Sequence, residues 1–168
     1  RGVPKTKVKK VGACATRGTT VTFEPDPEIF KEIKFSYQKV LDHLRQQAFL
    51  TKGVKVEIID TRKEPAYYGF YFDGGLLSFI KYLSRTDKPF QEIPFYVQKS
   101  AEEVDVEATF LYTQDSDIQE ISFANNIYTP DGGMHLTGFR SALTRAINNY
   151  AYENEYLKKN EEGLTGDD

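Results

Sequence analysis

Hydrophobic and polar residues follow two periods along the chain, and their order predicts a mixed α and β protein. Stretches rich in β-branched and aromatic residues, several of them alternating with polar ones, predict strands at 18–25, 54–58, 67–72, 95–97, 104–112 and 121–126. Apolar residues at i, i+3, i+4 and i+7 predict three helices, which begin near Ser36, after Gly75 and after Gly133. Because hairpins lie between the helices, we expect a two-layer α+β sandwich with helices on one face of a mixed sheet.

The first and third helices carry the longest apolar stripes. The stripe of the first helix consists of Tyr37, Val40, Leu41, Leu44 and Ala48, and Lys52-Gly53 supplies a basic residue and a glycine that end this helix. The stripe of the third helix consists of Leu136, Phe139, Leu143, Ile147 and Tyr150. We expect both stripes to face the hydrophobic core.

Length and composition place the chain among ordinary globular domains. It has 168 residues, of which 39% are hydrophobic and 28% charged, enough for one sizeable core. It has no run of about eighteen apolar residues, and residues 1–17 lack the apolar part of a secretory signal, so we expect a cytoplasmic protein. With one cysteine, Cys14, and two histidines, His43 and His135, disulfide scaffolds and zinc fingers are excluded.

Charge is distributed unevenly, although the net charge is only −3. Residues 1–17 carry six basic side chains and no acid, whereas residues 153–168 carry six acids and two lysines. The basic arm, residues 1–17, could contact nucleic acid or another anionic partner through counterion release. A solvated extension is the simpler alternative.

The chain lacks the motifs of a self-sufficient enzyme. It contains no G-x-x-x-x-G-K-[ST] phosphate loop, no G-x-S-x-G elbow, no H-E-x-x-H and no G-x-G-x-x-G. Cys14 lies in the basic arm without a neighbouring base, which argues against a thiol nucleophile. We predict no catalytic residue and no metal site in this chain.

Two Asp-Gly-Gly turns, at 73–75 and 131–133, each precede a predicted helix. At the first turn we expect glycines that permit a sharp turn and an aspartate that caps the helix. The second differs because His135, Arg140 and Arg145 lie on or near the start of the helix that follows. Arg140 stands at the edge of the apolar stripe, where an arginine can line a cavity, bind phosphate or pair with an acid.

Five segments occur in an order that one family shares. They are Gly18–Phe30, Ala48–Gly53, Asp73–Gly75, Ser122–Ile127 and Asp131–Arg145. The most specific are Phe-x-Asn-Asn-Ile at 123–127 and Gly-Gly-x-His-Leu-x-Gly-Phe-Arg at 132–140. In these motifs the chain resembles the B subunit of bacterial DNA gyrase and the closely similar E subunit of topoisomerase IV, over about residues 12–168. It departs from the family pattern at Met134, where threonine is usual, and at residues 128–130.

The resemblance implies the transducer domain of a type IIA DNA topoisomerase, which follows an ATP-binding GHKL domain. Its fold in the family is an α+β sandwich with a left-handed βαβ crossover, first described in a small-subunit ribosomal protein. Its role is to couple ATP binding and hydrolysis in the neighbouring domain to gate closure and DNA strand passage. On this basis we expect a linker from the ATPase domain at 1–17, a transducer domain incomplete at its C-terminus at 18–157, and a flexible tail at 158–168.

The resemblance also assigns residues, cofactors and partners. Arg140 matches an arginine that lines the cavity holding the transported DNA. Arg145 and His135 are candidate anion or DNA contacts because of their positions on or near the start of the same helix. The family's Gln-Thr-Lys loop, which contacts the γ-phosphate, follows the motif at 165–168, so we expect no ATP site here; ATP and Mg²⁺ serve the full-length enzyme. The expected partners are duplex DNA, the A-type breakage-reunion subunit in an A2B2 complex, and a second copy of the B-type chain through the ATPase domain. The isolated fragment is expected to be inactive, and the enzyme cytoplasmic and nucleoid-associated.

Two other functions stay open. A small-molecule kinase of the GHMP type shares the fold, but it requires a Gly/Ser-rich phosphate loop that neither Asp-Gly-Gly turn supplies. A free-standing DNA-binding or interaction module is suggested by the basic arm, although the negative net charge argues against it.

Overall fold

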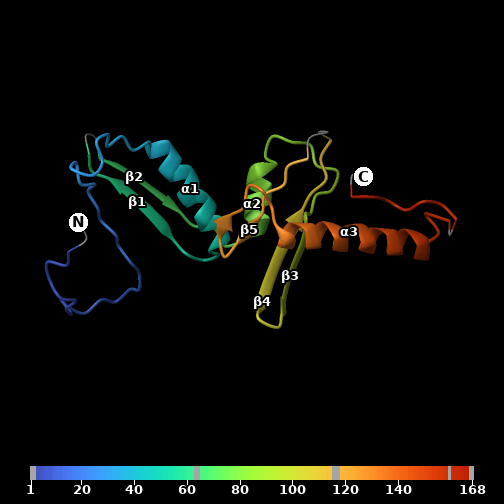
Figure 1. The fold of residues 1–168 in the computed structure, drawn as a ribbon, viewed down its shortest axis with the longest axis horizontal. Helices are drawn as coiled ribbons and strands as arrows, with labels where there is room; N and C mark the ends of the chain where they lie inside the picture. The colour runs from blue at the N-terminus through green and yellow to red at the C-terminus, as the bar shows by residue number, and fades with distance from the viewer. Residues whose placement is uncertain (1–2, 63–64, 115–117, 159, 167–168) are drawn as a thin grey trace. The chain divides into compact units, whose positions relative to one another are not determined.

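The computed structural model describes residues 3–62, 65–114, 118–158 and 160–166. The chain divides into two units, Arg1–Ser36 and Tyr37–Asp168, and each is described by itself (Figure 1).

The N-terminal unit forms neither helix nor strand in its described residues. A turn at Asp26 is its main ordered feature: the Asp26 carboxylate accepts a hydrogen bond from the Glu28 amide at 2.9 Å. The ring of Phe23 packs edge-on against Phe35, with centroids 5.8 Å apart. The strand predicted at 18–25 is wrong here, because no described segment pairs with its backbone and its apolar side chains stay in solvent.

The second unit contains all of the regular elements in the described residues. They are α1 (Tyr37–Leu50), β1 (Val56–Asp60), β2 (Ala66–Phe70), α2 (Leu76–Leu83), β3 (Phe95–Ala101), β4 (Val104–Phe110), β5 (Phe123–Ala124), β6 (Ile127–Tyr128) and α3 (Met134–Glu153). The three predicted helices are confirmed, and so is the hairpin of β1 and β2.

The core of this unit lies between α1 and the β1–β2 hairpin, which run alongside each other (Figure 1). Its buried members are Leu41, Ala48 and Phe70, and partly buried side chains of α1, β1 and the segment after β2 pack around them. Helix α1 ends at Leu50, three residues before the glycine expected to cap it. Gly53, with its positive φ of 76°, lies in a turn that the Val54 amide closes by donating to the Thr51 carbonyl at 3.1 Å.

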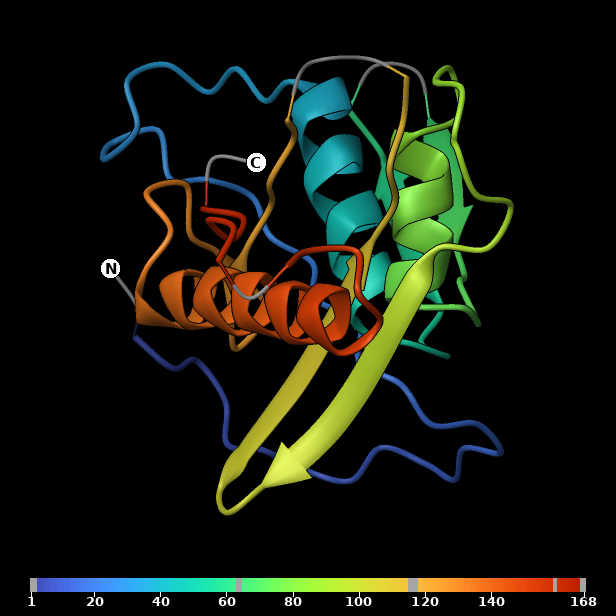
Figure 2. The same cartoon turned by 90° about the vertical axis from the view of Figure 1, so that its right-hand side faces the viewer.

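An aromatic cluster joins α1 to α2. The ring of Phe49, only 2% exposed, stacks on Phe72 at 3.6 Å and on Phe79 at 5.0 Å between centroids. Arg45 adds a polar contact, since its guanidinium donates to the Tyr82 hydroxyl at 3.1 Å and lies 5.4 Å from the centre of that ring. These contacts hold the two helices side by side (Figure 2).

The strands at 95–97 and 104–112 are confirmed and pair with each other as β3 and β4. Alternate residues fall on opposite faces of this hairpin. One face is polar and includes Tyr96, whose hydroxyl donates to Glu107 at 2.8 Å. The other face is apolar, and Phe95 and Phe110 stack on it at 4.6 Å.

The strand predicted at 121–126 is shorter than expected and turns back on itself. Asn125 and Asn126 both have positive φ, 50° and 64°, as the two central residues of a type I′ turn require. Because asparagine tolerates this conformation, the chain folds into the short hairpin of β5 and β6.

The α+β class is confirmed, whereas strand pairing differs from the single mixed sheet that we expected. The described strands form three separate two-stranded antiparallel sheets, each made by neighbours along the chain. Such local pairing requires the smallest loss of loop entropy. The left-handed crossover needs parallel strands and stays a prediction.

Helix α3 buries less of its apolar stripe than we expected. Leu143 is only half-buried, and among the residues of α3 only Ala151 is buried. The segment after α3, expected to be a flexible tail, folds back on the helix in its described residues (Figure 2). There the Asn148 carboxamide donates to the Leu164 carbonyl at 2.8 Å and accepts from the Leu164 amide at 2.7 Å.

Candidate functional site

The turn before α3 depends on its glycines rather than on an aspartate cap. Gly132 and Gly133 have φ of 70° and 151°, and the N-terminus of α3 has no side-chain capping bond. The turn before α2 likewise has no such bond, and there Asp73 interacts with the Tyr71 hydroxyl, which raises the pKa of Tyr71. The expected aspartate cap is therefore wrong at the first turn.

His135 faces the β5–β6 hairpin. Its Nε2 lies 3.3 Å from the Thr129 hydroxyl, and that hydroxyl donates to the Ser122 carbonyl at 2.9 Å. These contacts tie the first turn of α3 to the hairpin. They give His135 a structural partner, and its role as an anion contact stays a prediction.

Arg140 forms a two-pronged ion pair with Glu120, a residue of the irregular segment before β5. Its Nε donates to one carboxylate oxygen at 2.9 Å, and a terminal guanidinium nitrogen donates to the other. This hydrogen bonding lowers the pKa of Glu120. The two side chains keep 55% and 34% of their area in solvent, so the pair is accessible. Of the alternatives for Arg140, this structure shows the pairing with an acid and the lining of a cavity, which is described next.

A hollow of about 460 Å³ lies beside Arg140 along the polar face of α3. It is lined by Arg140, Ser141, Thr144, Arg145, Asn148, Asn149 and Gly166. The guanidinium groups of its two arginines are of the kind that binds phosphate oxygens. The hollow brings Arg140 and Arg145 together and leaves out His135.

Of the polar side chains that line this hollow, Arg140 and Arg145 were predicted from the sequence, whereas Ser141, Thr144, Asn148 and Asn149 were missed. A signal was present, because all six occur in adjacent pairs at 140–141, 144–145 and 148–149, which is the four-residue spacing of one helix face. Glu120 had no comparable signal, because it lies twenty residues before Arg140 in a segment without a period.

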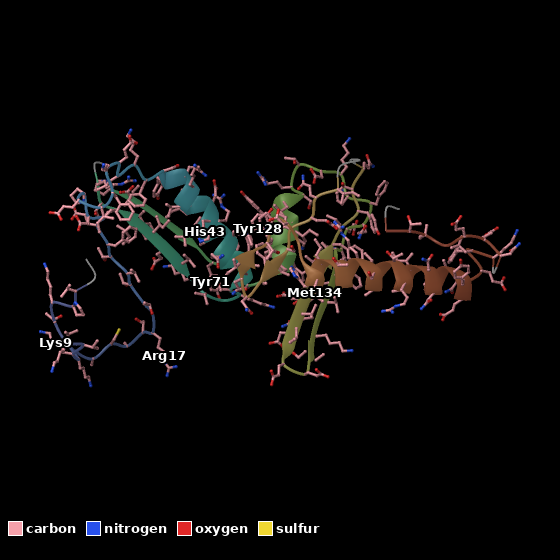
Figure 3. The ribbon with its side chains drawn as sticks, viewed as in Figure 1. Lys9, Arg17, His43, Tyr71, Tyr128 and Met134 are labelled. Atoms are coloured by element: carbon pink, nitrogen blue, oxygen red, sulfur yellow. The ribbon has the colours of Figure 1, made fainter. Side chains whose placement is uncertain are left out.

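A second hollow, of about 410 Å³, lies between α1 and the β5–β6 hairpin. Figure 3 shows His43 and Tyr128, which line it from the two sides. The Gln47 carboxamide donates to the Asn126 carbonyl at 3.0 Å across it. The ionisable side chains in its lining are the His43 imidazole and the Tyr128 phenol. The lining therefore offers no permanent positive charge for an anion.

The basic arm and the cysteine complete the candidate chemistry. The side chains of Lys9 and Arg17 are exposed (Figure 3), as are all described residues of the arm. Cys14 has the Thr16 hydroxyl as its neighbour at 3.7 Å, and hydrogen bonding to Thr16 lowers the pKa of this exposed thiol. Within the described parts of the chain, no three His, Cys, Asp or Glu side chains gather as metal ligands, and no helix is long and apolar enough to cross a bilayer.

Comparison with known proteins identifies the family. The family model for DNA gyrase B matches residues 75–168, which include α2, α3 and the whole hollow beside Arg140. The chain belongs to the DNA gyrase B family. The resemblance predicted from the sequence is confirmed at this level.

Curated members of the gyrase B family match the full length of the chain. The gyrase B protein of Clostridium acetobutylicum is 41% identical over 169 residues, and that of Streptococcus pyogenes serotype M3 is 40% identical over 171. In both cases all of this chain is covered but only 26% of the relative. The chain therefore spans about a quarter of the length of these gyrase B proteins.

Solved structures agree with this assignment. The 43K ATPase domain of Thermus thermophilus gyrase B, in complex with an aminocoumarin, is 39% identical with a TM-score of 0.73. The match covers 86% of this chain and 39% of that one. The topoisomerase IV ATP-binding domain of Francisella tularensis, at 23% identity and a TM-score of 0.69, shares the fold.

Proposed function

We propose that the chain is the transducer part of an ATP-dependent type IIA DNA topoisomerase. In this role it couples ATP binding and hydrolysis in a neighbouring GHKL domain to gate closure and DNA strand passage. The observation that carries the proposal is the gyrase B match over residues 75–168, the segment in which the Arg140 hollow lies.

ATP and Mg²⁺ serve the full-length enzyme in this proposal, and the neighbouring GHKL domain would hold the nucleotide. We expect the isolated chain to be inactive.

For this chain's own residues we propose a contact with duplex DNA. Arg140 and Arg145 present guanidinium groups on one side of α3, and such groups bind the phosphate backbone without reading sequence. Backbone contact suits an enzyme that passes any duplex through a break. A rigid-body movement of the domain would couple this contact to the ATP cycle, if DNA binds the closed state more tightly than the open one.

The proposed partners follow from the same role. They are duplex DNA, an A-type breakage-reunion subunit in an A2B2 complex, and a second copy of the gyrase B-type chain. We propose a cytoplasmic, nucleoid-associated enzyme on this basis.

The test is the substitution Arg140→Gln in the full-length subunit. We expect DNA-stimulated ATP hydrolysis to fall more than basal hydrolysis, because the variant loses a phosphate contact and keeps the fold. Steady-state ATP hydrolysis with and without linear duplex DNA measures both rates. If both rates fall equally, or the variant does not fold, Arg140 is structural and the proposed DNA contact fails.

A further inference from the structure

Arg140 is held by an acid from a different segment of the chain. Glu120 precedes β5, whereas Arg140 lies in the second turn of α3, and the pair joins the two segments through two hydrogen bonds. Since both side chains are partly exposed, the contact can be exchanged for another without unfolding.

Carboxylate and phosphate compete for the same part of a guanidinium. Both groups accept two parallel hydrogen bonds from its planar fork, and one edge of the fork cannot serve both. The hydrogen bonds from Arg140 lower the pKa of Glu120, so the competing carboxylate is ionised at neutral pH.

We propose that Glu120 is a positioning residue that occupies the Arg140 guanidinium until a DNA phosphate replaces it. The identity of this anion rests on the proposed function. In the absence of DNA the carboxylate fixes the side chain and offsets its charge. When DNA binds, Glu120 must give way, so its contact lowers the affinity of the site.

A second arginine beside the hollow favours displacement of the Glu120 carboxylate by the phosphate backbone of DNA. Arg145 lies on the same side of α3, and among the described residues no ion pair involves it. Duplex DNA can therefore contact Arg145 and Arg140 together, whereas the Glu120 carboxylate contacts Arg140. A polyanion that meets both arginines outcompetes a single carboxylate.

The test is Glu120→Gln in the full-length subunit, with duplex DNA binding measured by fluorescence anisotropy at fixed salt. An exposed ion pair of this kind is worth up to about fivefold in an equilibrium constant. We therefore expect the variant to bind duplex DNA about two- to fivefold more tightly. Glu120→Asp keeps the charge on a shorter side chain and should lie between wild type and Glu120→Gln.

Glu57→Gln is the matched control. Glu57 is also a half-exposed acid in an ion pair, with Lys55 at 2.8 Å, but it lies on β1. Glu57→Gln changes the net charge by the same amount as Glu120→Gln. Its effect on DNA binding therefore measures how much the loss of one negative charge, anywhere on the protein, changes the affinity for DNA. We expect the gain of Glu120→Gln to exceed it.

A double-mutant cycle with Arg140→Gln separates the outcomes. The gain from Glu120→Gln should vanish in the Arg140→Gln background, because no guanidinium remains to be released. A gain that persists there, or one no larger than that of Glu57→Gln, overturns the inference and leaves the proposed function intact if Arg140→Gln weakens DNA binding. If Arg140→Gln and Glu120→Gln both leave DNA binding unchanged, the inference and the proposed DNA contact fail together.

Discussion

The ion pair of Arg140 and Glu120 is better suited to ligand exchange than to holding the fold. Exposed ion pairs typically contribute about 0–1 kcal/mol to stability. The pair therefore costs little to open, and its geometry preserves the orientation that a phosphate would use.

The pH dependence of stability tests the ion pair between Glu120 and Arg140. The pKa of Glu120 is lowered from 4.5 by its hydrogen bonds with Arg140, so the pair stabilises the fold above pH 4.5. That stability is lost as pH falls through the lowered pKa of the folded state. We expect a carboxyl titration by NMR to place the Glu120 pKa below 4.5, and Arg140→Gln to move it back up. An unchanged pKa in the variant would show that Arg140 does not set it.

Residue patterns predicted one partner of this site and not the other. Arg140 was predicted because it follows a turn and sits at the edge of an apolar stripe. Glu120 approaches it only through the path of the chain before β5, and no spacing in the sequence encodes that path.

Helices α1 and α3 differ in how much of their apolar stripes they bury. Leu41 and Ala48 of the α1 stripe are 7% and 0% exposed, whereas Leu143 of the α3 stripe is half-buried. The same apolar periodicity thus gives a core helix in one case and a partly covered helix in the other. Periodicity identifies a face, but the neighbouring elements decide how deeply it is buried.

This contrast predicts different costs of truncation. Phe49→Ala should lower the free energy of unfolding by about 3–5 kcal/mol, because it opens a cavity among the stacked rings. Leu143→Ala should lower it by only about 1 kcal/mol, since part of that side chain is already in solvent. Equilibrium urea unfolding of the chain compares the two variants. Equal losses would contradict the placement of the core between α1 and its neighbours.

Strand predictions succeeded where the partner is adjacent along the chain. The pairs β1–β2 and β3–β4 need only a short loop, and alternation located both of them. The segment 18–25 has the composition of a strand but no adjacent partner, and Asn125-Asn126 introduces a turn inside what composition predicts as one strand. Composition shows that a segment is able to form a strand, but a strand also requires a second segment with which its backbone can pair.

For the whole molecule, the α+β architecture agrees with membership of the gyrase B family. The proposed function applies to a subunit longer than this chain. The gyrase B model covers residues 75–168, and the relatives are about four times as long as the chain. The α+β class followed from the order of elements, but the mixed sheet did not form among the described strands. Pairing between distant strands cannot be derived from periodicity, because it depends on the path of the entire chain.

We propose that the polar face of α3 contacts duplex DNA in the assembled enzyme. The most direct measurement is photo-cross-linking in the full-length subunit, with a photoreactive phenylalanine at Thr144 in the hollow and, as a control, at the exposed Gln38 of α1. We predict that irradiation with linear duplex cross-links DNA more from position 144 than from 38, and that Arg140→Gln lowers the yield at 144. Equal yields at the two positions, or none at 144, would mean that the polar face of α3 does not contact the duplex.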